Sequence, residues 1–157
     1  MVHLTRYLNK TEAFLSFQDF LRGTKERLYV HDTTDEAPLL LALAAWEERK
    51  QPLVIVLPNL YRAQQTYDRL SVLLGEDCFF FPQDEFITSE MLVSSHEFKI
   101  ERLHTIAEIL SGRPIVVVTH TIGYVAPQMP IEHWKSAKIS LKTGMEYPME
   151  NLLRSLQ

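Results

Sequence analysis

The apolar positions of this chain predict strands and helices in alternation. Two segments, Leu53 to Leu57 and Ile115 to Val118, are apolar without interruption. Such runs are typical of strands buried on both faces, as in a parallel sheet. Two further apolar runs, about residues 27–31 and Cys78 to Phe81, predict additional strands. The pattern therefore predicts a sheet whose strands are mainly parallel.

Between these runs, apolar residues recur at helical spacing, and capping residues mark the helix ends. Asn59 and Ser95 are suitable N-caps, and Gly75 and Gly112 are suitable stops. The predicted helices span residues 10–22, 36–49, 60–74 and 96–111. In the last two, the residues predicted to face inward are Leu60, Ala63, Tyr67, Leu70 and Leu74, and Ile100, Leu103, Ala107 and Leu110.

The pattern becomes weaker after Pro127 and Pro130. Lys138 to Leu141 alternates like an edge strand, and Pro148 is placed to open a last helix that reaches Leu156. Strands alternating with helices predict one three-layer α/β domain over residues 1–157. The last helix has no stop signal, and we expect the chain to be a fragment of a longer protein.

The composition changes this picture little. At 46% hydrophobic and 23% charged residues, it is that of an ordinary globular protein. The net charge of −4 argues against nucleic-acid binding driven by electrostatics alone, which needs a basic surface. Cys78 is the single cysteine, so an internal disulfide is impossible. The sequence has no apolar run long enough for a membrane span and no secretion signal, and we expect a cytoplasmic protein without a membrane partner.

The segment from Arg27 to Lys50 has the layout of a phosphate-binding P-loop without its chemistry. The Walker pattern GxxxxGK[ST] would place its glycines, lysine and hydroxyl at four positions that have none of these residue types: Val30, Asp35, Glu36 and Ala37. Asp35 is a suitable N-cap, which would put Pro38 in the first helical turn. Two carboxylates then occupy the positive end of the helix dipole. We expect a capped helix without nucleotide; an acidic ligand or metal loop is the alternative.

Two weaker candidates lie after the later strands. Asp84 and Glu85 follow the apolar run that ends at Phe81, as the metal-binding carboxylate of a Walker B element would, but Pro82 and Gln83 intervene. A solvated loop is the simpler interpretation. His120 lies where strand 115–118 ends, and ligands of open α/β sheets bind at that end. A hydrogen-bonded structural histidine is the alternative to catalysis there.

Several segments resemble one protein family. IVLPNLYRAQQTYDRL resembles motif Ia of the UvrB-type helicase fold, through Pro58, Asn59, Ala63, Gln65 and Tyr67. FPQDEF and IERLHTIAEILSGRPIVVVTHTIGYVAP are similar to the bacterial transcription-repair coupling factors, the Mfd family. ISLKTGMEYPMENLLRSLQ resembles a later passage of the same family. The matches follow the family's order over most of residues 27–157.

The resemblance implies a RecA-like, P-loop-NTPase-type core at residues 27–126, preceded by helix 10–22 and followed by a strand and helix within 137–156. It implies a non-catalytic copy of the UvrB module, with a degenerate P-loop, no cofactor and no metal. In the parent protein, it implies other domains of the same chain, UvrA, RNA polymerase and DNA as partners, and a separate ATP-driven DNA translocase. A small nucleotide-binding or NTP-hydrolysing domain that uses Asp84, Glu85 or His120 is the alternative function.

Overall fold

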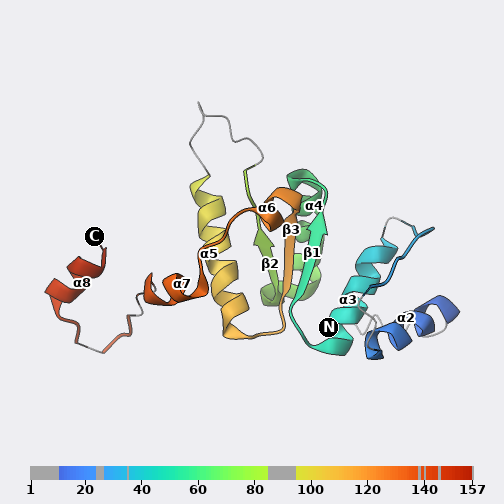
Figure 1. Ribbon diagram of the computed structural model, residues 1–157, viewed down its shortest axis with the longest axis horizontal. Helices are drawn as coiled ribbons and strands as arrows, with labels where there is room; N and C mark the ends of the chain where they lie inside the picture. Colours follow the sequence, from blue (N-terminus) through green and yellow to red (C-terminus); the bar gives the residue numbers. More distant parts are fainter. Residues whose placement is uncertain are drawn as a thin grey trace. The chain divides into compact units, whose positions relative to one another are not determined.

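The protein is described by a computed structural model (Figure 1). The described residues are 11–23, 27–34, 36–84, 95–137, 139, 141–144 and 146–156. They form two compact units, Met1–Val125 and Ala126–Gln157. We describe each unit by itself, and the division into domains predicted from the sequence stays a prediction.

The first unit contains a parallel sheet, which confirms the predicted α/β class. Its strands are β1 (Leu53–Leu57), β2 (Cys78–Phe81) and β3 (Val116–His120), in the order β1-β3-β2. Both outer strands pair with β3 in parallel, with Val116 opposite Leu53 and Cys78. The architecture is consistent with a RecA-like three-layer fold. Because β3 lies between the other two, all five of its residues are buried.

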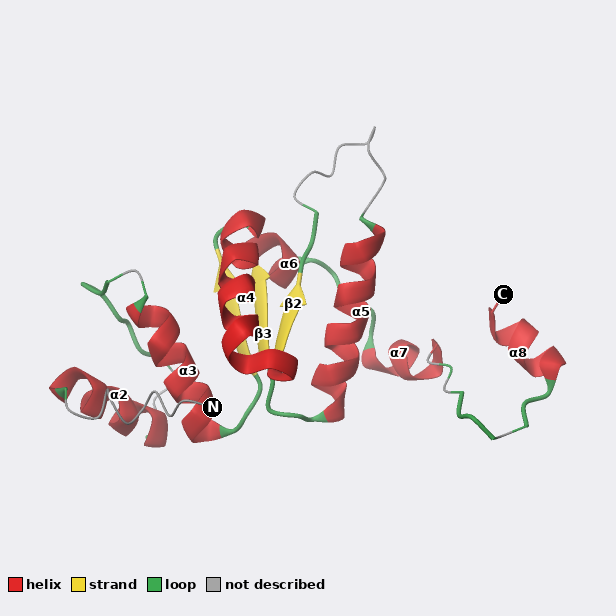
Figure 2. Ribbon diagram, turned by 180° about the vertical axis from the view of Figure 1, so that it is seen from behind, coloured by secondary structure: helices red, strands yellow, loops and turns green. Residues whose placement is uncertain are grey.

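Helices flank this sheet on different sides (Figure 2). Helix α4 (Leu60–Leu74) crosses one face and contacts all three strands, and the short 3-10 helix η1 (Gly75–Asp77) leads from it into β2. Helix α5 (His96–Ser111) runs beside β2. Helix α3 (Ala37–Arg49) contacts β1 and helix α2 (Glu12–Arg22), and α6 (Thr121–Val125) follows β3 directly. In the sequence, β1 is followed by α4 and β3 by α6.

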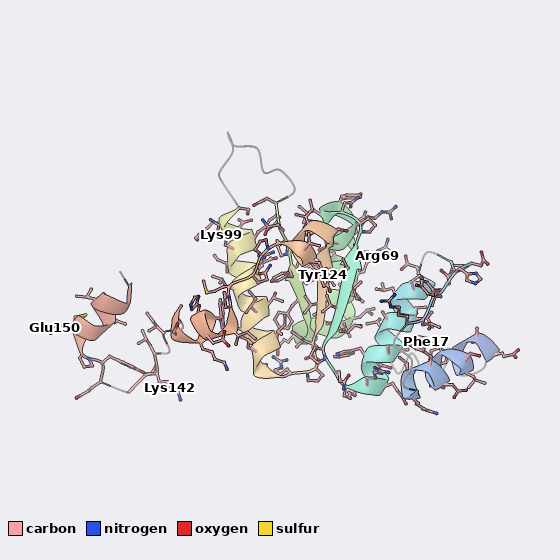
Figure 3. All side chains as sticks on the ribbon, in the orientation of Figure 1. Phe17, Arg69, Lys99, Tyr124, Lys142 and Glu150 are labelled. Atoms are coloured by element: carbon pink, nitrogen blue, oxygen red, sulfur yellow. The ribbon has the colours of Figure 1, made fainter. Side chains whose placement is uncertain are left out.

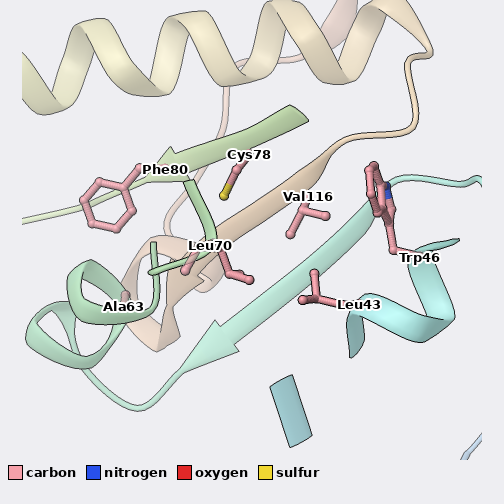
Figure 4. Close-up of a cluster of buried hydrophobic side chains, with 8 residues drawn as sticks. Leu43, Trp46, Ala63, Leu70, Cys78, Phe80 and Val116 are labelled. Atoms are coloured by element: carbon pink, nitrogen blue, oxygen red, sulfur yellow. The ribbon is translucent and has the colours of Figure 1, made fainter. Parts of the chain in front are cut away.

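The main core lies between the sheet, α4 and α3 (Figure 4). The Tyr67 and Phe80 rings stack with centroids 5.2 Å apart. Trp46 is 3% exposed, and its indole N–H donates to the carbonyl of Pro114 over 3.0 Å. The buried members of this core cluster are Leu43, Trp46, Ala63, Leu70, Cys78, Phe80, Val116 and Val118. The burial of α4 through Ala63 and Leu70 confirms its predicted inward face.

The predicted caps of the two longest helices are confirmed. The side chain of Asn59 accepts a hydrogen bond from the backbone N–H of Arg62 over 2.9 Å, and Ser95 accepts one from Phe98 over 3.4 Å. Gly112 ends α5 with a φ of 77°, in the left-handed region where a side chain would be strained. Local sequence chemistry was sufficient to place these boundaries because a cap acts within one helical turn.

Three predictions about the first unit were wrong. Residues 27–31 form no strand; they are exposed and irregular, although Leu28, Tyr29 and Val30 have strand-forming side chains. Strand β1 is not buried on both faces, because Val54 is 47% and Val56 44% exposed. Helix α5 is rotated relative to the prediction: it directs Thr105 rather than Ile100, Leu103 and Leu110 toward the sheet. In each case tertiary packing overrode a local pattern.

The second unit holds α7 (Ile131–Ala137) and α8 (Met149–Leu156). The last helix was predicted, whereas α7 and α6 were not, because their sequences are too short to show a helical period. The predicted edge strand at 138–141 is wrong for its described residues: Ala137 ends a helix, and Ile139 and Leu141 are in no strand. Lys138 and Ser140 lie outside the described residues.

Candidate functional site at the carboxyl edge of the sheet

The candidate site is the edge of the sheet where the three parallel strands end. Leu57, Phe81 and His120 are the last residues of the strands, and the paired register brings them to the same edge. Open α/β sheets bind ligands at this edge, because loops diverge there and leave a crevice. Whether the edge is free for a ligand depends on how its carbonyl and hydroxyl groups are engaged.

His120 is fully buried at the end of β3. Its Nε2 atom lies 3.2 Å from the backbone nitrogen and 3.0 Å from the carbonyl oxygen of Gln83. One tautomer accepts from the amide and the other donates to the carbonyl, so either form joins β3 to the segment after β2. This nitrogen is directed at backbone rather than into an open crevice, which fits the structural interpretation of His120.

The two threonines beside His120 also bond to backbone carbonyls at the ends of the strands. The Thr119 hydroxyl donates to the carbonyl of Phe81 over 2.6 Å, and the Thr121 hydroxyl donates to that of Leu57 over 3.3 Å. Each hydroxyl therefore gives a hydrogen bond to a backbone carbonyl oxygen at the carboxyl edge of the sheet. The sequence placed these threonines at this edge but gave no sign of their partners.

Gly123 lets α6 pack closely against this edge. A Cβ atom added there would lie 2.6 Å from the Thr119 hydroxyl and 3.0 Å from the carbonyl oxygen of Phe81. Those two atoms are already hydrogen-bonded to each other, so neither can move away without breaking that bond. Glycine is required here by the close approach of the helix.

Asp84 connects the segment after β2 to the start of α5. Its carboxylate accepts a hydrogen bond from the backbone N–H of Ser95 over 3.0 Å. Within the described part of the chain, three or more His, Cys, Asp or Glu side chains nowhere gather as a metal site would require. Glu85, the second residue of the predicted metal pair, lies outside the described residues.

Arg102 of α5 completes the edge at β2. Its guanidinium donates to the carbonyl of Pro82 over 3.0 Å and lies 4.2 Å from the centre of the Phe81 ring. Burial lowers the pKa of this guanidinium, but an arginine remains charged throughout the physiological range. The sequence analysis missed Arg102, although an arginine among apolar helix positions was a signal that it has a partner.

The three described Walker positions, Val30, Glu36 and Ala37, do not belong to this edge. Val30 is 48% exposed in the irregular segment, and Asp35 lies outside the described residues. Glu36, rather than the predicted Asp35, is the N-cap residue of α3; Ala37 is the first residue of the helix, with Pro38 in its first turn. The side chain of Glu36 makes no cap hydrogen bond and instead forms an ion pair with Arg69 of α4 (Figure 3 labels Arg69).

The residues that resemble motif Ia have separate places on α4. Asn59 caps the helix, and Ala63 and Tyr67 belong to or pack against the core. The Gln65 amide donates to the Tyr61 hydroxyl over 2.8 Å at the surface. Pro58 is an exposed residue between β1 and the cap. Of these five, Tyr67 lines a groove between α4, β2 and α5, and Gln65 lines another, between α3, β1 and α4.

That groove has a volume of about 420 Å³ and lies between α3, β1 and α4. Its polar lining comes from Glu36, Arg62, Gln65, Thr66 and Arg69. Since Arg69 is paired with Glu36, the groove has both charges on its walls rather than a single cationic cradle for phosphate. Arg62 and Arg69 were missed by the sequence analysis, and their seven-residue spacing on one helix was the available signal.

Comparison with known proteins identifies similar chains. The chain is 27% identical over 158 aligned residues to a transcription-repair-coupling factor of Bacillus subtilis (strain 168), which covers 99% of this chain and 13% of that protein. It is 22% identical over 121 residues to the factor of Staphylococcus aureus (strain USA300), covering 76% of this chain and 10% of that one. No family model and no solved structure matches.

The chain thus spans a small part of the length of these relatives. In the described residues, no helix has the length and apolar character needed to cross a membrane. The matches name the same family that the motif order indicated, and they do so over nearly the whole chain in one case and three quarters of it in another. The resemblance is therefore confirmed: this chain is similar to a piece of a transcription-repair-coupling factor.

Proposed function

We propose that this chain is a non-catalytic scaffold and regulatory module of a transcription-repair-coupling factor, which acts in transcription-coupled nucleotide excision repair. The observation that carries the proposal is the similarity to the Bacillus subtilis factor over 99% of the chain. In the parent protein, a separate ATP-driven DNA translocase displaces stalled RNA polymerase, and UvrA is recruited. This chain supports both events through contacts with other domains of the same polypeptide.

The hydrogen bonds at the carboxyl edge support a non-catalytic role. His120, Thr119, Thr121, Asp84 and Arg102 all bind backbone groups of this chain. A catalytic acid or base must instead reach a substrate proton directly or through one water. These side chains hold the strand ends together, which is the role of a rigid support.

The start of α3 supports the same interpretation. A nucleotide site places a phosphate at the positive end of this helix, whereas here the carboxylate of Glu36 lies there and pairs with Arg69. A triphosphate would have to displace that ion pair and would meet the negative charge of Glu36. The chain thus provides its own anion where a nucleotide would bind.

Titration of the chain with ATP and magnesium tests the proposal. We expect no saturable heat of binding up to millimolar nucleotide, with an intact P-loop ATPase as the positive control. Saturable binding at physiological nucleotide concentration would contradict the scaffold role. It would favour the small nucleotide-binding domain, and loss of that binding in His120→Gln or Asp84→Asn would then locate the site.

A loop replacement gives a second test. When residues 30–37 are replaced by a glycine-rich loop containing lysine, we expect no ATP turnover, because the Asp84 carboxylate is engaged with Ser95 and the described residues contain no cluster of three possible metal ligands. The matched control is the same replacement with the lysine changed to alanine. Lysine-dependent hydrolysis above that control would refute the non-catalytic interpretation.

A further inference from the structure

Strand β1 has an open edge. It pairs with β3 on one side, and in the described sheet no strand lies on its other side (Figure 1). The N–H of Leu53 donates to the carbonyl of Ile115 over 2.9 Å, so the backbone groups of Leu53 are directed toward β3. Because these directions alternate along a parallel strand, the N–H and C=O groups of Val54 and Val56 point away from β3. In the described part of the chain, no other segment forms a hydrogen bond with these groups.

The other outer strand, β2, is covered on its outer side by α5. The Thr105 hydroxyl of that helix donates to the carbonyl of Phe80 over 2.8 Å. Strand β1 has none of the residues that usually block an edge, because its sequence LVIVL contains no proline, lysine or glycine. Helix α3 contacts β1 but leaves a groove along Ile55–Leu57. The edge of β1 is therefore open to a further strand.

The sequence of β1, LVIVL, reads the same in both directions. An antiparallel pair of two such strands, centred on Ile55, places Val54 of one copy opposite Val56 of the other. The backbone groups of both residues point outward, so each Val54–Val56 pair can exchange both of its N–H···O bonds. Ile55 then faces its own counterpart on the twofold axis, at a position that needs no hydrogen bond between the strands. The register that matches the side chains is thus also the register that matches the backbone groups.

The side chains and charges around β1 fit the same arrangement. Val54 is 47% and Val56 44% exposed, on the face of the strand that points away from the core. A twofold axis perpendicular to the sheet keeps these side chains on one face of the joined sheet, where β-branched residues pack well against their neighbours. Residues 51–59 contain no charged side chain, so the pairing brings no like charges together.

We propose that the open edge of β1 is a dimer interface, at which β1 pairs antiparallel with β1 of a second copy of this chain to form one continuous sheet. The proposal goes beyond the proposed function and does not depend on it. The twofold pairing uses the open edges of both copies, and the outer side of β2 is covered by α5, so the assembly stops at two chains. A pair of five-residue strands offers less contact area than the ~1,200 Å² of a standard interface, so the dimer should be weak and concentration-dependent.

Sedimentation equilibrium of this chain measures the association. From low-micromolar to near-millimolar protein concentration, we expect the mean mass to rise from that of the monomer and to level off at that of the dimer. A monomer over the whole range would overturn the proposal and would leave the edge of β1 for a strand of a different segment. A mass that continues to rise beyond the dimer would also overturn it, because a twofold pairing closes at two chains.

A proline substitution tests the role of the backbone. Val56→Pro removes the outward N–H, which forms no bond within the sheet, and should raise the dissociation constant of the dimer at least about tenfold. The matched control is Val54→Thr combined with Val56→Thr, which makes the same face more polar but keeps every backbone group. Its dissociation constant should stay within roughly threefold of the native value. Far-UV circular dichroism and the urea midpoint show whether each monomer is folded. Loss of the dimer in the threonine variant alone would overturn the proposal, because apolar packing rather than strand pairing would then join the copies.

Paired charges test the register, and they replace the proline variant if that variant folds poorly. Val54→Lys combined with Val56→Lys places like charges opposite each other across the axis, so this variant should stay monomeric where the native chain dimerises. Val54→Glu combined with Val56→Lys places opposite charges there and should restore the dimer. High salt should reduce the difference between the two variants, because it screens exposed charges. Equal dimerisation of the two variants at low salt would overturn the proposed pairing, because these positions would then not lie opposite each other.

Discussion

The two outer strands of the sheet, β2 and β1, differ in how the chain covers them. Beside β2, helix α5 binds the carbonyl of Phe80 through Thr105 and the carbonyl of Pro82 through Arg102. On β1, every second side chain is left about half exposed, at Val54 and Val56. One outer strand is thus protected by the helix that follows it in the sequence, and the other is protected on a single face.

The difference shows that strand sequence does not by itself decide burial. Strand β1 reads LVIVL and β2 reads CFFF, and both would suit an interior position. An outer strand without cover exposes apolar side chains and backbone groups that favour association with another strand. The apolar side chains of β1 at Val54 and Val56 therefore stay about half exposed on one face of the sheet.

The two outer strands should differ most in the free energy of unfolding that is lost when one apolar side chain in each is replaced by alanine. Phe80→Ala should lower the free energy of unfolding by about 3–5 kcal/mol, because Phe80 is 4% exposed and packs against Tyr67 and Phe98. Val56→Ala should cost roughly 1 kcal/mol or less, since much of Val56 remains in water. Urea unfolding measures both. A similar cost at the two sites would show that β1 is as well covered as β2.

Loss of the Thr105 hydroxyl should lower the free energy of unfolding by less than loss of the Phe80 ring. Thr105→Val keeps the shape but leaves the Phe80 carbonyl without this donor, and we expect a loss of about 1–3 kcal/mol. Thr105→Ser, which keeps the hydroxyl, should be the milder variant. If valine and serine were equally destabilising, the hydrogen bond would not be what secures α5 on this strand.

Polar replacement on the open side of β1 should have a small effect in this chain. Val54→Thr combined with Val56→Thr should change the unfolding free energy by no more than about 0.5 kcal/mol per site, because a half-exposed hydroxyl keeps its water. A loss above roughly 2 kcal/mol for the pair would mean that the strand is covered on both faces. In the full parent protein, a larger loss than in this chain would indicate that another segment covers β1.

The smallest expected effect concerns Glu101, which lines the groove between α5 and β2. The raised pKa of Glu101 means that the folded state favours its protonated form, so this stabilisation is complete below pH 4.5 and is lost as the pH rises through the raised pKa. Glu101→Gln has no carboxyl to ionise, so it does not lose this stability as the pH rises. The variant should therefore be more stable than the native chain near pH 7, by a few tenths of a kcal/mol after solvent screening. The two stabilities should converge toward pH 4. If the stability advantage of Glu101→Gln grew as the pH fell, the prediction would be contradicted.

Much of the fold could be predicted from local patterns. The unbroken apolar runs located β2, β3 and β1, and Asn59 and Ser95 located the starts of α4 and α5. The candidate site was partly predictable, because His120 and Asp84 were placed near the ends of parallel strands. Their partners, the backbone groups of Gln83 and Ser95, depend on how separate loops meet, and no local pattern contains that information.

The sequence by itself determined which segments form helices and strands in most of the first unit, because period, caps and apolar runs act over a few residues. Only the tertiary structure decided which side of α5 faces the sheet. Thr105 and Arg102 satisfy buried carbonyls, and an unsatisfied buried carbonyl costs more than the exposure of an aliphatic side chain. Tertiary structure also decided the state of residues 27–31. They have strand-forming side chains but no pairing partner in the described sheet, and they are irregular.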